Sequence, residues 1–356
     1  MNKSLDKNKV ILGLSGGVDS ATAALLLKDK GKEVIGLYFD VSGENEKGRR
    51  EAEGLAKQLG IDFVYKNVKD EFTSIVIDNF CSEYTKGRTP NPCIVCNPNV
   101  KFKTLIEEAN KQGAYYIATG HYAKTIFNEE DNNWYIKQAE NDKKDQSYMM
   151  YRLGQHVISR LLLPLADLHD KEETRNIARE NHLKNAETKD SQEICFIGDD
   201  EHYIDFIKEK KYRVKSGKFI DKNGKVLGDH KGLVNYTIGQ RKGLGITFGK
   251  PVFVTRLDEV KNTVTLGDKE DLMSCQVICK GNFFTESDGE NLPHHLENTK
   301  VYAKIRYSAK SAEATIKTID SGRVESMFTL PQRAATPGQS IVFYLNNQVI
   351  GGGFIE

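Results

Sequence analysis

Long apolar runs are missing from this 356-residue chain, in which no stretch approaches 18 consecutive apolar residues. We therefore predict no membrane-spanning helix. The first residues contain lysines, but they lack a long apolar run and a small-residue cleavage site, which argues against a signal peptide. Cysteine is scarce as well. Six cysteines in a chain of this length are too few for a disulfide scaffold, so we expect a reducing, cytoplasmic location.

A strong excess of one charge is also missing, since the net charge is +1, but the charges are unevenly distributed. Residues 1–200 carry 28 Lys and Arg against 32 Asp and Glu, residues 201–272 carry 15 against 10, and residues 273–356 carry 8 against 8. Positions 208–250, here called the basic segment, hold 12 basic and 3 acidic side chains. Such a local excess is typical of a surface that docks a polyanion, although a solvated lysine-rich surface gives the same pattern.

The first 200 residues alternate between strand-like and helix-like segments. Continuous apolar runs such as KVILGLS and EVIGLYFD predict buried parallel strands. The segments SATAALLLKDKG, EGLAKQLG and KFKTLIEEANKQG have helical spacing and end at glycine. This alternation predicts an α/β fold with a doubly wound parallel sheet.

The pattern changes after residue 200. Asn223-Gly224 lies between two short strand-like segments and predicts a tight hairpin. Beyond residue 273, short alternating segments such as KVYAKIRYS, EATIKTID and RVESMFTL predict a small antiparallel β-barrel. We therefore predict three domains: residues 1–200 with the parallel sheet, residues 201–272 with the basic segment, and residues 273–356 with the C-terminal barrel.

The motif GLSGGVDS follows a buried strand and opens a helix, which is the usual setting of a phosphate-binding loop. Its members are Gly13, Leu14, Ser15, Gly16, Gly17, Val18, Asp19 and Ser20. No lysine follows the glycines, so the motif is neither a Walker loop nor a dinucleotide loop. Asp19 is unusual beside phosphate unless it holds a metal ion or orients the loop.

The SGGVDS sequence resembles the pyrophosphatase loop of the PP-loop ATPases, which adenylate a carbonyl oxygen and then displace AMP with a nucleophile. No glutaminase domain is recognisable that would supply ammonia, whereas two cysteine motifs stand out, GRTPNPCIVCN and DSQEICFIG. Together with YIATGHYA, KKDQSYMMY, YTIGQRKGLGI and the C-terminal TPGQSIVFYLNNQVIGGGFIE, they resemble, in order, the motifs of the bacterial tRNA-specific 2-thiouridylases. Thiolation of the wobble uridine U34 in the tRNAs for Lys, Glu and Gln is the activity this resemblance implies.

The resemblance also implies roles for individual residues. ATP, with Mg²⁺, would lie on Gly13–Ser20 between Phe39 and Gly120. Cys195 would receive a persulfide sulfur from a desulfurase or relay protein, and Cys96 would be the second catalytic cysteine, forming a transient disulfide with Cys195. Lys101, Lys103 and Arg88 are close in sequence to Cys96, and each is a candidate to favour its thiolate. Cys81, Cys275 and Cys279 are expected to be inert, buried thiols.

For RNA, the resemblance implies contacts from residues spread along the chain, and the basic segment is expected to dock the tRNA. These residues are Asn91, Pro92 and Cys93, then His121, Lys144, Asp145 and Gln146, and finally Arg306, Tyr307 and Gln339. His121 could alternatively act as a catalytic base, and Tyr307 could be a core aromatic of the barrel. The target uridine must leave the anticodon stack to react.

Cys93 departs from the family, in which many members have aspartate at this position. Three hypotheses describe the role of Cys93. It is a spectator, it is an acid–base group, or it ligates an iron–sulfur cluster together with Cys96 and Cys195. The segment after Asp40 is shorter than in many members, and the segment RYSAKSAEA at Arg306 is less basic than expected. Two other functions remain open, a PP-loop ligase for another base or small molecule and a non-catalytic RNA-binding protein.

Overall fold

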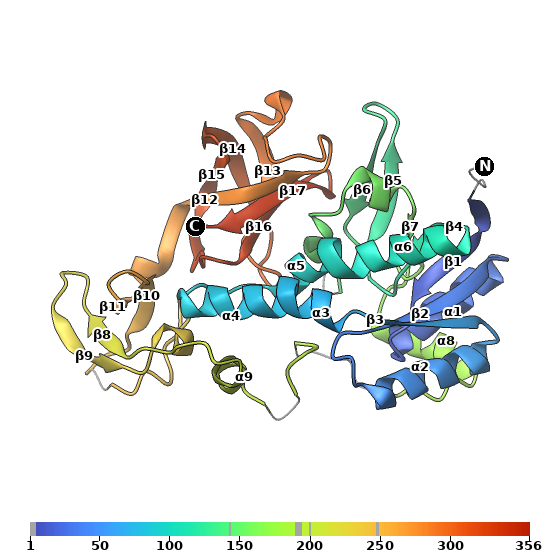
Figure 1. The fold of residues 1–356 in the computed structure, drawn as a ribbon. Coiled ribbons are helices and arrows are strands. Elements are labelled where there is room, and N and C mark those ends of the chain that lie inside the picture. Colours follow the sequence, from blue (N-terminus) through green and yellow to red (C-terminus); the bar gives the residue numbers. More distant parts are fainter. Residues whose placement is uncertain (1–4, 142–143, 189–193, 199–200, 247–248) are drawn as a thin grey trace. The chain divides into compact units, whose positions relative to one another are not determined.

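The computed structural model describes residues 5–141, 144–188, 194–198, 201–246 and 249–356. The chain divides into two compact units, each assembled from separate segments (Figure 1). The first unit consists of Met1–Ile75, Cys93–Gln192 and Asn346–Ile350, and the second of Val76–Pro92, Glu193–Leu345 and Gly351–Glu356. The three-domain division given above remains a prediction.

A five-stranded parallel sheet forms the centre of the first unit, in the strand order β3-β2-β1-β4-β7. Its strands are β1 (Asp6–Gly13), β2 (Glu33–Asp40), β3 (Asp62–Asn67), β4 (Ala114–Ala118) and β7 (Leu161–Leu162). The apolar runs of β1 and β2 are buried because helices cover both faces of the sheet. The predicted doubly wound parallel sheet is confirmed.

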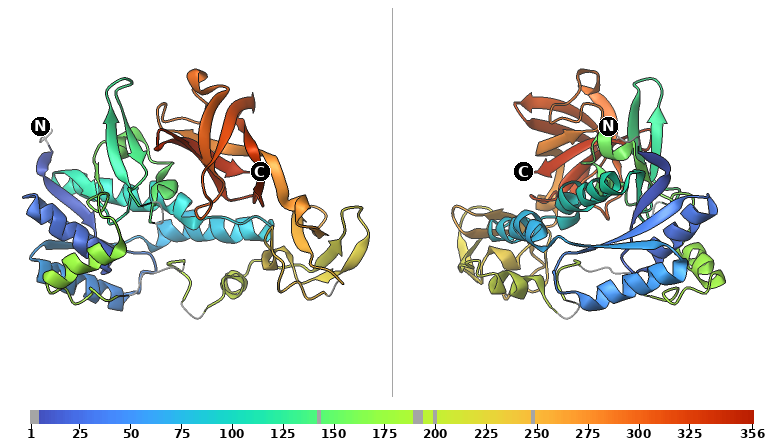
Figure 2. Two further views of the ribbon diagram at one scale, coloured as in Figure 1. Left: turned by 180° about the vertical axis from the view of Figure 1, so that it is seen from behind. Right: turned by 45° about the vertical axis from the view of Figure 1, so that its right-hand side comes forward.

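Helix α6 lies on one face of this sheet, and α1, α2 and α8 lie on the other (Figures 1 and 2). The helices of this unit are α1 (Val18–Asp29), α2 (Glu46–Leu59), α3 (Lys69–Phe72), α6 (Phe102–Gln112), α7 (Gln155–Ile158) and α8 (Lys171–Glu180), with the 3₁₀ turn η3 (Ser147–Met150). Gly60 and Gly113 adopt the left-handed conformation directly after α2 and α6, as the sequence predicts for glycine at a helix end. Small alanines let α1 pack closely against α8 and the sheet.

Two further elements complete the first unit. A hairpin of β5 (Lys124–Asn128) and β6 (Asn133–Lys137) follows β4, and Gln348 pairs with Lys137 of this hairpin. A nearly continuous helical segment precedes α6, formed by α5 (Pro92–Cys96) and the π-helical turn η2 (Asn97–Lys101). Another π-helical turn, η1 (Thr73–Ile77), follows α3 where the chain leaves the first unit.

A four-stranded sheet in the second unit has the order β10-β11-β8-β9. Its strands are β8 (Gly217–Ile220), β9 (Val226–His230), β10 (Phe253–Asp258) and β11 (Thr263–Gly267), and α4 (Asp78–Thr85), α9 (Tyr203–Glu209) and η4 (Leu233–Asn235) accompany them. The predicted hairpin at Asn223-Gly224 joins β8 and β9, where Gly224 has φ 86°. The rings of Tyr84 and Tyr203, 4.6 Å apart, connect α4 to α9.

Six antiparallel strands form a closed barrel in the C-terminal region, in the order β12-β15-β14-β13-β16-β17, with β12 also pairing with β17. The strands are β12 (Met273–Phe284), β13 (Thr299–Lys304), β14 (Ala312–Asp320), β15 (Arg323–Arg333), β16 (Ser340–Leu345) and β17 (Gln348–Ile355), with the 3₁₀ turns η5 (Glu270–Leu272) and η6 (His294–Leu296). Glycine permits the closure, because a β-carbon on Gly353 would lie 2.1 Å from Oδ1 of Asn282. The predicted barrel is confirmed.

Candidate functional site

The candidate site lies at the carboxyl ends of β1 and β4, which are neighbours in the sheet. The chain leaves β1 toward β2 on one side and later returns to form β4 on the other, so this is the switch point at which doubly wound sheets bind ligands. A β-carbon built on Gly13 would lie 3.7 Å from the Phe39 ring and 3.8 Å from Thr119. A β-carbon on Gly120 would lie 2.8 Å from the backbone of Asp19. The structure thus brings together the residues predicted to surround ATP.

Residues 13–20, here called the nucleotide loop, are held by hydrogen bonds within the loop. The hydroxyl of Ser20 donates to the Gly17 carbonyl at 3.0 Å and accepts from the Ser15 amide at 3.3 Å. Gly16 has φ 85°, which a side chain would strain, and Gly17 is the N-cap of α1. The first turn of a helix leaves backbone N–H groups without intrahelical acceptors, so the loop and α1 together suit an anion.

Asp19 is engaged by side chains that the sequence analysis missed. The Lys171 ammonium donates to both carboxylate oxygens, at 2.6 and 2.7 Å, and the Tyr122 hydroxyl donates to Oδ1 at 2.7 Å. Asn185 also reaches the nucleotide loop, donating from Nδ2 to the Gly16 carbonyl at 2.7 Å. No local pattern could have revealed these contacts, since they join residues more than 100 positions apart.

The second group of predicted residues lies on the segment Pro92–Lys101, here called the cysteine helix. Its first turn carries Cys93 and Cys96, and the helix then widens into the π-helical turn η2. Pro98 lies in this turn and has no N–H to donate, which explains why the α-helical ladder is interrupted there. Nδ2 of Asn97 donates to the Met149 carbonyl at 2.8 Å and fixes the turn. Short π-helical turns are frequent at functional sites.

Four influences act on the Cys96 thiol. Burial raises its pKa above the ordinary value, and the neighbouring Cys93 raises it further. The Lys101 ammonium and the Lys101 backbone N–H oppose this by favouring the thiolate. Lys101 is therefore the cation that acts on Cys96. Lys103 instead pairs with Glu71, and Arg88 pairs with Glu83 at 3.4 Å.

His121 connects the cysteine helix to the end of β4. Its ring stacks on Phe102, the first residue of α6, with centroids 6.0 Å apart, and its Nδ1 lies 2.8 Å from the Thr119 hydroxyl. Burial, with a smaller contribution from Lys101, lowers the pKa of His121 to about 3. The imidazole is therefore neutral at pH 7, which argues against the catalytic alternative, and the RNA contact of His121 stays a prediction.

The nucleotide loop and the cysteine helix thus meet through two consecutive residues. Gly120 packs against Asp19, and His121 stacks on the helix that continues from Cys96. The nucleotide loop and residues 93–101 of the cysteine helix belong to the first unit.

The other five cysteines have different surroundings. Cys93 is exposed, and Cys195 is exposed in the second unit. Cys81 and Cys279 are buried, and burial raises the pKa of both thiols, that of Cys81 to about 11, which supports their assignment as inert. Cys275 is only half-buried. Within the described ranges, no three His, Cys, Asp or Glu side chains are grouped so that they could hold a metal ion.

The predicted RNA-contact residues 144–146 form a turn that is fixed to Tyr122. The Gln146 amide donates to the Tyr122 carbonyl at 2.8 Å, and Oε1 of Gln146 accepts from the Tyr122 amide at 3.0 Å. Asp145 is 2% exposed, and its carboxylate accepts bonds from Gln138, Ala139 and Ser147. The Asp145 side chain therefore holds the turn together, while Lys144 and Gln146 are partly exposed.

The remaining predicted RNA contacts lie in or beside the second unit. Nε2 of Gln339 donates to the Thr89 carbonyl at 2.7 Å, which places Gln339 beside the segment that leads to Asn91 and Pro92. Nη1 of Arg306 donates to the Arg333 carbonyl at 3.1 Å. Tyr307 is 37% exposed, so it is not a core aromatic of the barrel.

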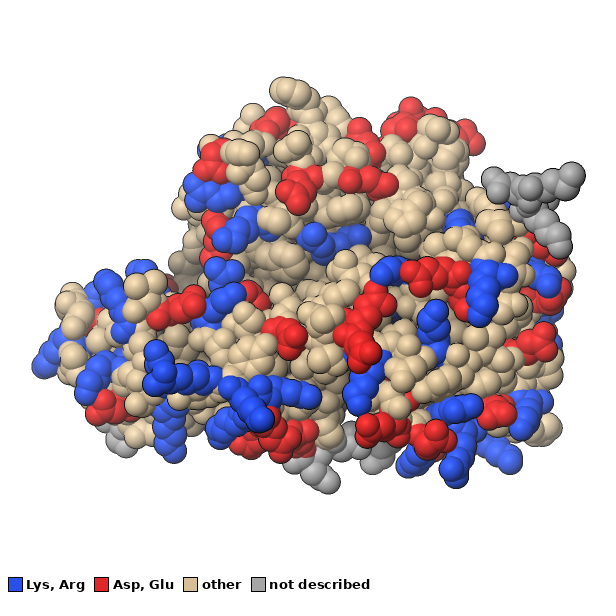
Figure 3. All heavy atoms as spheres, viewed as in Figure 1, with Lys and Arg blue, Asp and Glu red and all other residues tan. Residues whose placement is uncertain are grey.

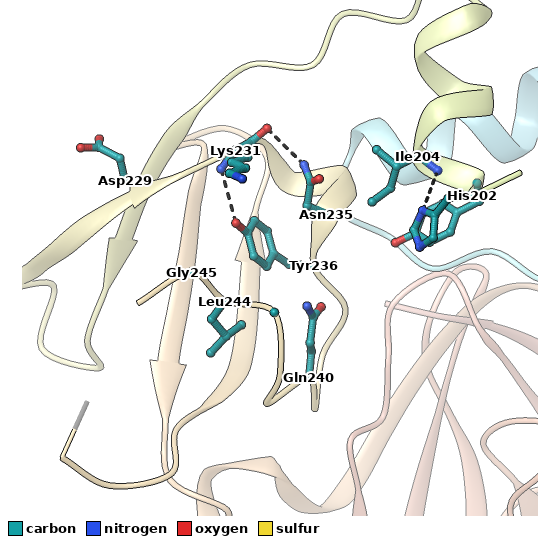
Figure 4. Close-up of a pocket in the computed structure, with 11 residues that line it drawn as sticks. His202, Ile204, Asp229, Lys231, Asn235, Tyr236, Gln240, Leu244 and Gly245 are labelled. Atoms are coloured by element: carbon teal, nitrogen blue, oxygen red, sulfur yellow. Dashed lines mark hydrogen bonds between the residues drawn. The ribbon is translucent and has the colours of Figure 1, made fainter. Parts of the chain in front are cut away.

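The basic segment runs from the end of α9 through β8, β9 and η4 of the second unit, where Figure 3 shows Lys and Arg side chains gathered. A cavity of about 480 Å³ lies in this region (Figure 4). Its lining comes from the start of α9, before the basic segment, and from the second half of the segment: His202, Tyr203, Ile204, Asp229, Lys231, Asn235, Tyr236, Gln240, Gly243, Leu244 and Gly245. Asn235 and Gln240 donate to backbone carbonyls of their own loops, so hydrogen bonds within the protein hold these walls in place.

None of the helices in the described part of the chain combines the length and apolar character that crossing a membrane requires.

Comparison with known proteins identifies the family. Residues 8–199 match a family model described as tRNA methyl transferase HUP domain, residues 204–268 a tRNA methyl transferase PRC-barrel domain, and residues 287–355 an aminomethyltransferase beta-barrel domain. The tRNA-specific 2-thiouridylase of Clostridium perfringens strain 13 is 44% identical over 99% of this chain and 99% of its own length. That of Clostridium acetobutylicum is 44% identical over 98% and 99%. The chain belongs to the tRNA-specific 2-thiouridylase family.

Among solved structures, the NMN synthetase of Francisella tularensis aligns with 51% of this chain and 66% of its own, with 15% identity and a TM-score of 0.34.

Proposed function

We propose that this protein uses ATP to replace the C2 oxygen of the wobble uridine U34 of tRNA with sulfur. One observation carries the proposal: Gly120 packs against Asp19 of the nucleotide loop, and His121 stacks on Phe102, which directly follows the cysteine helix, so that the anion-binding loop and the helical segment that carries Cys96 are connected at one edge of the sheet. Activation of an oxygen as an adenylate needs an anion-binding loop, and its replacement by sulfur needs a cysteine.

In the first step, ATP binds with its phosphates on the nucleotide loop, near Phe39 and Gly120. The C2 oxygen of uridine forms a bond to the α-phosphorus, and the bond from that phosphorus to the bridging oxygen breaks. The electron pair leaves with pyrophosphate, and C2 carries an adenylated oxygen. Backbone N–H groups of the loop and the first turn of α1 stabilise the phosphate charge, and Mg²⁺ would accompany the ATP.

In the second step, Cys195 carries a terminal sulfur as a persulfide. The Cys96 thiolate attacks the Cys195 sulfur, which releases hydrosulfide and forms a Cys96–Cys195 disulfide. Hydrosulfide then adds to C2, and AMP departs with the electron pair of the C2–O bond. A dithiol reductant supplies two electrons to regenerate both thiols. Direct attack of the persulfide on C2, assisted by Cys96, is the variant of this step.

The sulfur arrives from a protein that carries a persulfide, either a cysteine desulfurase or a relay protein. Exposure of Cys195 supports this part of the proposal, because a persulfide can reach a thiol only if the thiol is accessible to the donor. For tRNA, we propose docking on the basic segment and on the side chains of Arg306, Tyr307 and Gln339. Lys144 and Gln146 would contribute from the first unit.

In vitro thiolation tests the proposal. Purified protein, ATP, a persulfide donor and unmodified tRNA for Glu, Lys or Gln are incubated, and the nucleosides are analysed by mass spectrometry. We expect 2-thiouridine to form with stoichiometric AMP and pyrophosphate. Thiolation at another base, or adenylation of a small molecule instead of tRNA, would contradict the proposal. It would show instead that the protein is a PP-loop ligase for another base or for a small molecule. Binding of tRNA without any ATP cleavage would support the non-catalytic function.

The iron–sulfur alternative makes a different prediction. It requires Cys93, Cys96 and Cys195 to ligate a cluster, and protein purified without oxygen would then contain iron and acid-labile sulfide. We expect full activity from iron-free protein and from a Cys93→Ser variant. Loss of activity on removal of iron would establish the cluster instead.

A further inference from the structure

We infer that Lys171 is the cation that binds the polyphosphate of ATP on the nucleotide loop, and that Asp19 and Tyr122 position it there. This inference rests on the proposed function, because it assigns a residue to the same ATP site. The loop has no lysine of its own after the glycines, although most phosphate-binding loops pair backbone N–H groups with a cation. The structure provides a lysine at this place from a helix that lies 152 residues further along the chain.

The position of the ammonium follows from its partner. Nζ of Lys171 lies 2.6 and 2.7 Å from the two oxygens of Asp19, and Asp19 belongs to the first turn of α1, directly after Gly17 and Val18 of the loop. The side chain of Lys171 is 14% exposed, and that of Asp19 is 36% exposed. The ammonium is therefore largely shielded from solvent and is held by a carboxylate of the first turn of α1.

The electrostatics of α8 alone do not favour a lysine at position 171. Lys171 is the first residue of α8, after the N-cap Asp170, and a cation at this end of a helix is disfavoured by about 0.3–1 kcal/mol. The first turn of α1 adds a second positive helix end at the same place. Of the acidic residues in the first turn of α8, Glu172 pairs with Arg179 and Glu173 accepts from the His169 amide. The Lys171 ammonium thus bonds to a carboxylate in the first turn of α1, and the positive end of a helix favours a polyanion.

Tyr122 keeps this arrangement in place. Its hydroxyl lies 2.7 Å from Asp19 Oδ1 and 2.8 Å from the hydroxyl of Thr174 on α8, so one side chain connects α1, α8 and the segment after β4. Tyr122 is 3% exposed, and both of its backbone polar groups bond to Gln146. The Asp19 carboxylate is thus oriented by Tyr122 and in turn holds the ammonium beside the loop. Asp19 then acts as a positioning residue for Lys171.

The chemistry explains why a cation is needed. When the C2 oxygen bonds to the α-phosphorus, the electron pair of the breaking bond moves onto pyrophosphate, where negative charge grows. An ammonium already in place stabilises this charge without reorganisation, and an interaction of this kind is worth about 100- to 1,000-fold in rate. Lys171 should therefore affect both the binding of ATP and the adenylation step, but not the binding of tRNA.

Binding measurements on the full-length protein test the inference. The ligands are ATP in the presence of Mg²⁺, inorganic pyrophosphate and AMP, titrated against wild type, Lys171→Gln, Lys171→Arg and Tyr122→Phe. The matched control is Lys124→Gln, which removes a lysine that pairs with Asp167 at 2.8 Å on the hairpin of the same unit. For Lys171→Gln we expect at least tenfold weaker binding of ATP and pyrophosphate, unchanged binding of AMP, and a lower kcat for thiolation.

The other variants separate a phosphate contact from a structural role. Lys171→Arg should recover much of the ATP affinity, and Tyr122→Phe should lower kcat more modestly, whereas Lys124→Gln should resemble wild type. Equal affinities of Lys171→Gln and wild type for ATP and pyrophosphate would overturn the inference, as would a parallel loss of AMP binding and thermal stability that arginine does not rescue. If wild type binds ATP through Lys171 but forms no 2-thiouridine, the proposed function fails and the inference stands.

Discussion

The nucleotide loop and the cysteine helix lie in the same compact unit, but they depend on different parts of the chain. The loop presents backbone N–H groups, and its shape is set by glycines and by the hydrogen bonds among Ser15, Gly17 and Ser20. The cysteine helix presents one side chain, whose reactivity is set by burial and by Lys101. A substitution harms the loop mainly by adding atoms, and harms the cysteine helix mainly by removing a functional group or its neighbour.

The largest expected effect separates the two regions completely. Cys96→Ser should reduce 2-thiouridine formation about 1,000-fold or more, because a hydroxyl cannot attack a persulfide at neutral pH. ATP binding should be unchanged, since the nucleotide loop is intact. The control is Cys279→Ser, which removes a buried thiol of the barrel. Nucleoside mass spectrometry and ATP titration measure the two properties, and comparable thiolation by Cys96→Ser and wild type would refute the role of Cys96.

The next largest effect is expected at the nucleotide loop, where a substitution should weaken ATP binding and leave Cys96 unaffected. Gly120→Ala places a methyl group 2.8 Å from the Asp19 backbone, so the loop must shift. A displacement of about 1 Å costs about 100-fold in rate, so we expect ATP binding and adenylation to fall together. The reactivity of Cys96 toward alkylating agents should stay the same.

The matched control for this variant is Gly54→Ala, where a β-carbon would meet nothing within 4 Å and the residue lies within α2. It should leave activity unchanged and stabilise the protein slightly. If Gly120→Ala behaves like Gly54→Ala, Gly120 does not constrain the ATP site.

A smaller effect concerns the thiol alone. Lys101→Gln removes the positive charge that favours the Cys96 thiolate, so the pKa of Cys96, already raised by burial, should rise further. At pH 8, less thiolate is then present and iodoacetamide should alkylate Cys96 several-fold more slowly. Lys103→Gln, whose lysine pairs with Glu71, should leave the alkylation rate unchanged. An unchanged rate in Lys101→Gln would show that burial alone determines the reactivity.

The smallest effect lies where the two regions meet. Because burial lowers the pKa of His121 to about 3, its imidazole should remain neutral from pH 8 down to pH 5, without a change in its NMR chemical shifts. The unfolded chain takes up this proton below its ordinary value of 6.5, while the native protein does not. The contribution of His121 to the free energy of unfolding is therefore fully present above pH 6.5 and is lost as the pH falls toward 3. A titration midpoint near 6.5 in the folded protein would contradict the burial of His121.

Local patterns predicted much of the architecture. The apolar runs of β1 and β2, the glycine after α2 and the alternating segments of the barrel each depend on short-range periodicity, and each appears in the structure. The hairpin of β5 and β6 was missed, and so was the π-helical turn after Cys96. That turn follows from an interruption at one proline, which a search for regular periods does not detect.

The sequence by itself determined the nucleotide loop, the two catalytic cysteine candidates and the family to which they point, because these depend on residue types at short spacing. Only the tertiary structure decided that Asp19 holds Lys171, that Lys101 and not Lys103 or Arg88 acts on Cys96, and that His121 is neutral. These properties depend on distances between side chains from separate elements and on burial in the folded unit. Neither exists until α8, the cysteine helix and the end of β4 have packed around the same edge of the sheet.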